Sequence, residues 1–160
     1  MNLLYTLRIL GVLLMIFSTA QLFPAAVAYY YEEYSLIRVF FNTLLVTFLC
    51  GFLLYIVSGN RKEDLRTKDG FIITVLFWTV LAVFGSFPLF FAEEINISYV
   101  DALFESISGL TTTGATVLTG LDDLPRSILF YRQLLQWLGG MGIIVLAVAV
   151  LPLLGIGGMQ

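Results

Sequence analysis

Residues 98–117, SYVDALFESISGLTTTGATV, determine the fold that we expect. The stretch begins as a short helix over 98–110, with Ser98 as N-cap and Asp101 three residues later, where a capping box usually has glutamate. At about 1.5 Å per residue this helix covers roughly 20 Å, too little to cross a bilayer. A polar run with no helix-forming character, 111–117, follows at once. Because spanning apolar segments flank it, the stretch predicts a re-entrant helix and loop.

The composition of the whole chain indicates a membrane protein. Of its 160 residues, 59% are hydrophobic and only 12% are charged, whereas soluble chains have about 25% charged residues. The apolar segments long enough to cross the hydrocarbon core are 3–29, 36–57, 71–91 and 127–153. For the first of these, a cleaved signal peptide is the alternative, because Arg8, an apolar run and the small residues of 26–28 imitate one. We expect an all-α integral membrane protein.

The distribution of charge gives one consistent topology. The loop 58–70 has four of the eight Lys and Arg residues, and the positive-inside rule places it in the cytoplasm together with the N-terminus. The acidic residues of the other loops then lie outside: Glu32, Glu33, Glu93, Glu94, Asp122 and Asp123. We expect three parts: a transmembrane helix pair over 1–60, a basic cytoplasmic loop over 61–70 and a membrane-pore-membrane unit over 71–160.

The residue types that are missing exclude most enzyme chemistry. The chain has no histidine and a single cysteine, Cys50, so it cannot form by itself a Ser-His-Asp triad, a histidine-ligated metal site or an internal disulfide. A membrane protease would need paired carboxylates at membrane depth, but the acidic residues lie in loops and at helix ends. The net charge of −3 argues against nucleic acid as a partner. We expect neither an enzyme nor a cofactor.

The polar run 111–117 has the chemistry of a cation site. Irregular backbone at membrane depth needs protein or water around it, because each unsatisfied amide in hydrocarbon costs several kcal/mol. If the short helix enters from outside, its partially negative C-terminal end lies near the membrane centre. The threonine oxygens that follow are ligands of the kind that replace the hydration shell of K⁺ or Na⁺. Gly114 lets the carbonyls turn toward one axis, since glycine adopts positive φ without steric cost.

Two stretches resemble a known family. Residues 104–118 (FESISGLTTTGATVL) and 131–151 (YRQLLQWLGGMGIIVLAVAVL) resemble the Trk/Ktr/HKT superfamily of potassium transporters, most closely the bacterial TrkH/TrkG type of membrane subunit. The resemblance runs over nearly the whole chain: 1–60 resembles the extra leading helix pair of that subunit, and 71–160 resembles its first membrane-pore-membrane unit. In this family four such units surround a pseudo-fourfold pore, and each gives one filter strand.

The resemblance implies a function. It makes Thr111, Thr112, Thr113 and Gly114 the K⁺-contacting quarter of a selectivity filter, with carbonyls as the main ligands, and it implies potassium uptake across the bacterial cytoplasmic membrane. Compared with the TVGYG strand of tetrameric potassium channels, Thr116 stands where a second glycine would be, so K⁺ over Na⁺ selectivity stays open. The alternative is a non-conducting membrane assembly or scaffold protein whose re-entrant loop only packs.

Residues outside the polar run are expected to support it. Asp101 and Glu105 share one face of the short helix; they form either a cation-attracting entrance or a buried anchor, or else they are exposed exterior carboxylates. Arg132 lies about two turns into the last span, where an unpaired charge is costly. We expect it to snorkel to the exterior, with an ion pair to Glu105 as the alternative. Gly139 and Gly140 would let another backbone approach, that of the short helix or the filter strand, or serve generic helix packing.

The length of the chain limits what it forms alone. One filter strand supplies a quarter of a coordination shell, so 160 residues cannot enclose a pore. Either four copies assemble, which the leading helix pair would crowd, or the sequence is the N-terminal part of a longer subunit, which we expect. The expected partners are membrane lipid and the remaining pore units. By resemblance, a second subunit in a homodimer and a cytosolic nucleotide-binding regulator of TrkA type are also expected.

Overall fold

A computed structural model describes the backbone of residues 3–59 and 67–150, and within these ranges the side chains of 4–59 and 74–144. The regular elements of the described backbone are all helices, with no strand, which confirms the expected fold class. The elements are α1 (Leu3–Ala20), α2 (Leu22–Tyr30), α3 (Tyr34–Val57), α4 (Thr67–Phe91), α5 (Tyr99–Leu110), η1 (Leu121–Asp123) and α6 (Arg126–Val150).

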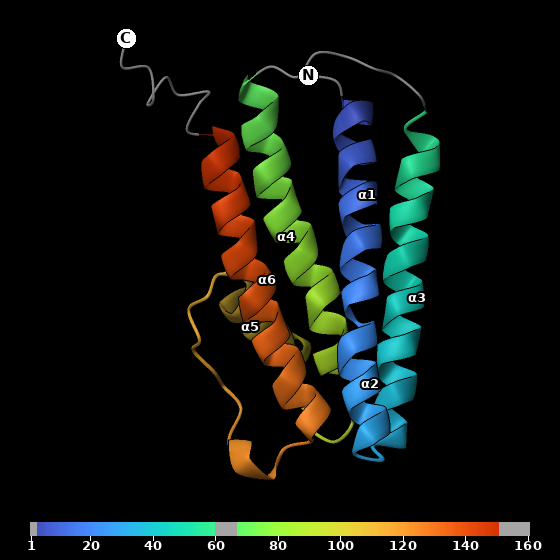
Figure 1. Cartoon of the computed structure of the whole chain (residues 1–160), viewed down its shortest axis with the longest axis vertical. Coiled ribbons are helices and arrows are strands. Elements are labelled where there is room, and N and C mark those ends of the chain that lie inside the picture. The colour runs from blue at the N-terminus through green and yellow to red at the C-terminus, as the bar shows by residue number, and fades with distance from the viewer. Residues whose placement is uncertain (1–2, 60–66, 151–160) are drawn as a thin grey trace.

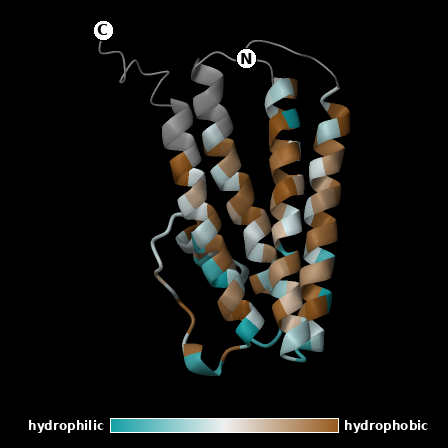
Figure 2. Cartoon of the chain, viewed as in Figure 1, coloured by the Kyte–Doolittle hydropathy of each residue, from teal (hydrophilic) through white to brown (hydrophobic). Residues whose placement is uncertain are grey.

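The long helices lie side by side, and the short helix α5 packs against α4 and α6 somewhat below the middle of the view (Figure 1). The long helices are mainly apolar (Figure 2), and many of their large apolar side chains are exposed. Three described segments have the length and composition to cross a membrane, Leu4–Tyr30, Tyr34–Val57 and Thr74–Phe91, and they correspond to the first three expected spans. α6 occupies the fourth expected segment as far as Val150, and residues 151–153 of that segment lie outside the described ranges.

The first expected span is two helices rather than one. α1 ends at Ala20 and α2 begins at Leu22, with Gln21 in a turn between them. Pro24 explains the break, because it has no N–H to donate to the carbonyl of Ala20 and its ring would collide with that carbonyl in a regular helix. The backbone N–H of Gln21 donates to Ser18 O at 3.1 Å, a tighter turn than the α-helical one. The continuous apolar run hid this break.

The leading helix pair is held together by two glycines. A Cβ added to Gly11 of α1 would lie 2.5 Å from the carbonyl oxygen of Gly51 of α3, and one added to Gly51 would lie 2.7 Å from Gly11 O. Small residues allow this approach of backbones, which supplies packing energy between helices in a membrane. A buried hydrogen bond from Thr43 Oγ1 to Gln21 Oε1, 2.6 Å long, adds a polar contact to the apolar interface.

Glu33, in the turn between α2 and α3, joins this pair to α6. One carboxylate oxygen accepts from Arg126 N at 2.7 Å, and the other accepts from Ser127 N at 3.1 Å and from Ser127 Oγ. The N–H groups of the first turn of a helix have no partner within the helix, and the helix dipole favours an anion there. Glu33 therefore caps α6 from another part of the chain. The sequence placed Glu33 in an exterior loop without a partner.

The acidic loops lie at one end of the bundle. Besides the Glu33 contacts, Ser35 Oγ donates a hydrogen bond to Glu94 Oε1, which brings the loop after α4 to the start of α3. The α2–α3 turn and η1 also lie at this end (Figure 1). The expected basic loop over 61–70 is described only from Thr67, where α4 already begins; residues 60–66 lie outside the described ranges. The expected start at 71 followed the edge of the apolar run, but the helix continues through the polar residues before it.

Candidate functional site

The short helix α5 ends within the depth of the bundle. Ser98 has extended backbone at the N-cap, and its Oγ accepts from Asp101 N at 3.2 Å. Asp101 differs from the glutamate of a capping box, because its Oδ2 accepts from Ser98 Oγ at 2.7 Å instead of reaching the backbone N–H. The helix has 12 residues, so at about 1.5 Å each it is roughly 18 Å long and too short to span.

The polar run 111–117 directly after α5, called the segment below, contains two residues with left-handed backbone conformation. Gly114 has φ +73°, as the sequence predicts for this glycine, and Thr112 has φ +58°. Threonine is β-branched and rarely adopts this conformation, which costs on the order of 1–2 kcal/mol for a residue with a Cβ. Such strain persists where surrounding contacts hold the backbone, and it occurs mainly at functional sites. No sequence pattern indicated this conformation for Thr112.

Ser108, in the last turn of α5, forms hydrogen bonds with the backbone of the segment. Its carbonyl oxygen accepts from Thr113 N at 2.9 Å and from Gly114 N at 3.4 Å. Its hydroxyl donates to Ala115 O at 2.6 Å. The amides of Thr113 and Gly114 and the carbonyl of Ala115 are thus turned toward α5. No sequence pattern singled out Ser108, although a serine near a helix end is a common partner for nearby backbone groups.

Four consecutive carbonyl oxygens have no such partner. Those of Thr111, Thr112, Thr113 and Gly114 accept no hydrogen bond from any residue that the structure describes. Residues 111–117 are also exposed in this chain. Within the described residues, no group of three or more Asp, Glu, Cys or His side chains could hold a metal ion. Within the described residues, these four carbonyls are therefore free to act as oxygen ligands for a cation.

Glu105 anchors the far end of the segment and pairs with Arg132. Its Oε1 accepts from Val117 N at 2.6 Å and from Thr116 Oγ1 at 2.5 Å. Its Oε2 accepts from Arg132 Nε at 2.8 Å, and the two side chains are only 1% and 9% exposed. A buried charge is tolerated when it is paired and its remaining lone pairs are satisfied, as here. Glu105 thus links α5, the segment and α6. No sequence pattern indicated Thr116 as a partner of Glu105.

The preferred expectation for Arg132 was wrong. The side chain does not snorkel to the exterior; it forms the ion pair with Glu105, which was the alternative. The reason is that α5 presents a carboxylate to this face of α6, so pairing offsets the cost of burial without a path to water. The two acidic residues of α5 also differ from each other. Glu105 is the buried anchor, whereas Asp101 is partly exposed and caps the helix.

The glycines of α6 do not act alike. A Cβ added to Gly139 would lie 2.0 Å from the carbonyl oxygen of Leu110, so α6 touches the C-terminal end of α5 there. A Cβ at Gly109 of α5 would lie 2.9 Å from Leu135 Cβ on the same interface. Gly140 faces Thr112, whose Cγ2 would be 3.9 Å from an added Cβ, which leaves room for a methyl group. Gly139 thus permits the expected backbone approach, and Gly140 lies beside the segment without requiring glycine.

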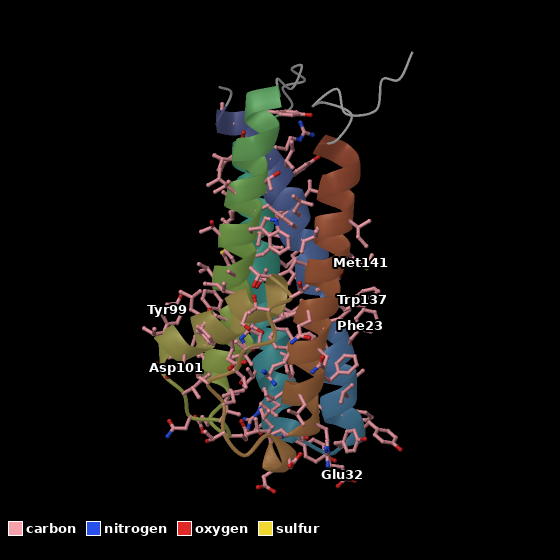
Figure 3. The ribbon with its side chains drawn as sticks, turned by 90° about the vertical axis from the view of Figure 1, so that its left-hand side faces the viewer. Phe23, Glu32, Tyr99, Asp101, Trp137 and Met141 are labelled. Atoms are coloured by element: carbon pink, nitrogen blue, oxygen red, sulfur yellow. The ribbon has the colours of Figure 1, made fainter. Side chains whose placement is uncertain are left out.

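Other residues of α5 and α6 lie away from the segment. Figure 3 shows Trp137 and Met141 projecting outward from α6, and Tyr99 and Asp101 at the far start of α5. Both outward residues of α6 are exposed. On the inner side, Tyr131 donates from its hydroxyl to Gly85 O at 2.8 Å, which fixes α6 to α4. The segment is therefore supported by helices that are bonded to one another, and its own residues are exposed.

Comparisons with known proteins agree on one family. The family model described as TrkH, cation transport protein, matches residues 36–160. The chain is 56% identical over 154 residues to the Trk system potassium uptake protein TrkH of Vibrio parahaemolyticus, covering 96% of this chain and 32% of that protein. It is 49% identical over 150 residues to TrkG of Escherichia coli K12, covering 94% and 31%.

A solved structure gives the same result for the fold. The crystal structure of the potassium transporter TrkH from Vibrio parahaemolyticus aligns with a TM-score of 0.92 and 54% identity, covering all of this chain and 34% of that one. The chain thus spans about a third of the length of the relatives that it matches.

Proposed function

This chain belongs to the TrkH family of cation transport proteins, and on that basis we propose that it contributes one of four filter strands to a potassium-conducting pore. Membership of a transport family confirms the expectation of a protein that is not an enzyme and needs no cofactor. The similar proteins are named potassium uptake proteins, so K⁺ is the proposed ion. The observation that carries the proposal is the row of four carbonyls from Thr111 to Gly114 that accept from none of the described residues.

The carbonyls act by replacing water around the ion. An ion that enters the pore loses hydration, and several carbonyl oxygens at once compensate for that loss. α5 ends directly before the strand, so the partial negative charge of its C-terminal end adds to the attraction. The left-handed conformations of Thr112 and Gly114 alter the direction of successive peptide groups. We infer that they turn the four carbonyls toward a common axis.

The strand supplies only a quarter of the ion's ligands. The proposed unit covers 71–160, with α5 as pore helix and 111–117 as filter loop, and the pair over 1–60 packs beside it. The remaining pore units belong to the rest of a full-length chain. The protein is a multi-pass membrane protein; we propose that its N-terminus and basic loop lie in the cytoplasm of a bacterium. A homodimer and a TrkA-type regulator are proposed from the resemblance.

Flux through the purified protein tests the proposal. The full-length protein in liposomes should release trapped K⁺ down its gradient at a rate well above that of empty liposomes. The same preparation measured with Na⁺ gives the selectivity. A non-conducting scaffold would give the rate of empty liposomes for both ions, and that result would contradict the proposal.

A further inference from the structure

A second site lies between the start of α3 and the end of α4, apart from the filter strand. A polar pocket of about 280 Å³ opens there. Its polar lining comes from the first three turns of α3 and from the loop after α4, and comprises Ser35, Arg38, Asn42, Glu93 and Glu94. The Ser35–Glu94 hydrogen bond fixes the two walls to each other. The pocket is therefore a defined feature of the interface between the leading helix pair and the pore unit.

An apolar groove of about 420 Å³ continues from this pocket along the same two helices. Val39, Asn42 and Phe91 line both, and Val46 and Phe87 line the groove alone. On α3 these positions form one stripe at helical spacing, which runs from Arg38 to Val46 over roughly 12 Å. A polar pocket thus passes directly into an apolar groove that follows the helix axis.

The charges of the pocket are available to a ligand. Arg38, Asn42 and Glu93 are exposed, and their side chains have no hydrogen bond or ion pair to the described residues. Glu94 accepts only from Ser35. One cation and two carboxylates leave the pocket with an excess of negative charge. A ligand that fits must offer an anionic group to Arg38 and a cationic group to the carboxylates.

We propose that a phospholipid with a zwitterionic amino headgroup, such as phosphatidylethanolamine, binds this pocket and groove. Its phosphate accepts from Arg38 and Asn42, its ammonium donates to Glu93 and Glu94, and one acyl chain lies along Val46 and Phe87. The position of the pocket along the bundle agrees with a headgroup site, because the exposed tyrosines at 29–31 and 34 mark a membrane–water interface nearby. An anionic lipid matches Arg38 but is repelled by the two carboxylates. This inference is independent of the ion pathway.

Lipid titration by native mass spectrometry tests the site. The delipidated full-length protein is titrated with phosphatidylethanolamine, phosphatidylcholine and phosphatidylglycerol of the same acyl chains. We expect phosphatidylethanolamine to bind at least about tenfold more tightly than phosphatidylglycerol. Only phosphatidylethanolamine donates charge-assisted hydrogen bonds from an ammonium to Glu93 and Glu94, and one such bond accounts for about a tenfold difference in affinity. Phosphatidylcholine should bind more weakly than phosphatidylethanolamine, since its quaternary ammonium has no N–H to donate.

Three variants and one control assign the effect to the site. Arg38→Gln should weaken phosphatidylethanolamine binding about tenfold, while Arg126→Gln, an exposed arginine at the same end of the bundle, should leave it unchanged. Glu93→Gln should reduce the preference for phosphatidylethanolamine over phosphatidylglycerol, and Val46→Trp should weaken all three lipids by filling the groove. The proposal is overturned if Arg38→Gln and Arg126→Gln bind alike, if the headgroup makes no difference, or if no lipid is retained because another part of the full chain fills the groove.

Discussion

Replacing Gly114 with alanine is expected to reduce K⁺ uptake by about tenfold or more while the protein still folds. Gly114 has φ +73°, and the nearest atom to an added Cβ is Gln136 Nε2, at 3.7 Å. Space is therefore sufficient, and the penalty comes from the backbone conformation, at about 1–2 kcal/mol. The strand can relieve this strain by rotating the peptide groups on either side, which moves the carbonyls of Thr113 and Gly114. The measurement is K⁺ uptake by a transport-deficient bacterium that produces the full-length protein.

Gly120→Ala is the matched control for this experiment. Gly120 has φ +64° and an open surrounding, with the nearest atom 4.0 Å from an added Cβ. It meets the same backbone penalty but lies at the N-cap of η1, after the filter segment. We expect Gly120→Ala to keep nearly normal uptake. Equal uptake by the two variants would mean that Gly114 serves only as a turn residue.

Breaking the Glu105–Arg132 pair is expected to have the second large effect. Arg132→Gln leaves the buried Glu105 carboxylate without its cationic partner, a change that costs about 3–5 kcal/mol in buried pairs. Because Glu105 also holds Val117 N and Thr116 Oγ1, the end of the filter strand should loosen too. We expect a lower midpoint of thermal unfolding in detergent and a loss of K⁺ uptake. Asp101→Asn, one turn earlier on α5, should change little because the side-chain oxygen of asparagine can still accept from Ser98 Oγ.

The exchanged pair separates the two roles of Glu105. With Glu105→Arg and Arg132→Glu together, an ion pair can form again, but position 105 no longer accepts from Val117 and Thr116. We expect the midpoint of unfolding to recover in part and K⁺ uptake to stay low. Full recovery of uptake would show that the filter needs the ion pair alone and does not need the carboxylate as an acceptor.

The sequence predicted the parts of this site that depend on local chemistry. The N-cap and the length of the apolar stretch predicted the short helix. The residue type predicted the positive φ of Gly114. The partners of Glu105 depend on how α5 is rotated against α6, which local patterns do not specify. The left-handed Thr112 opposes its own propensity and is held by tertiary contacts. Glu33 caps a helix that begins 93 residues later in the chain, a distance that no periodicity reveals.

The central claim is that the carbonyls of Thr111, Thr112, Thr113 and Gly114 hold the ion. Thallium(I) replaces K⁺ and scatters X-rays anomalously, so crystals of the full-length protein soaked in a thallium salt locate the ion directly. We expect anomalous peaks within coordination distance of these carbonyl oxygens, on the axis that the four strands share. Bound thallium away from these carbonyls, or no peak beside them in a protein that conducts the ion, would contradict the claim.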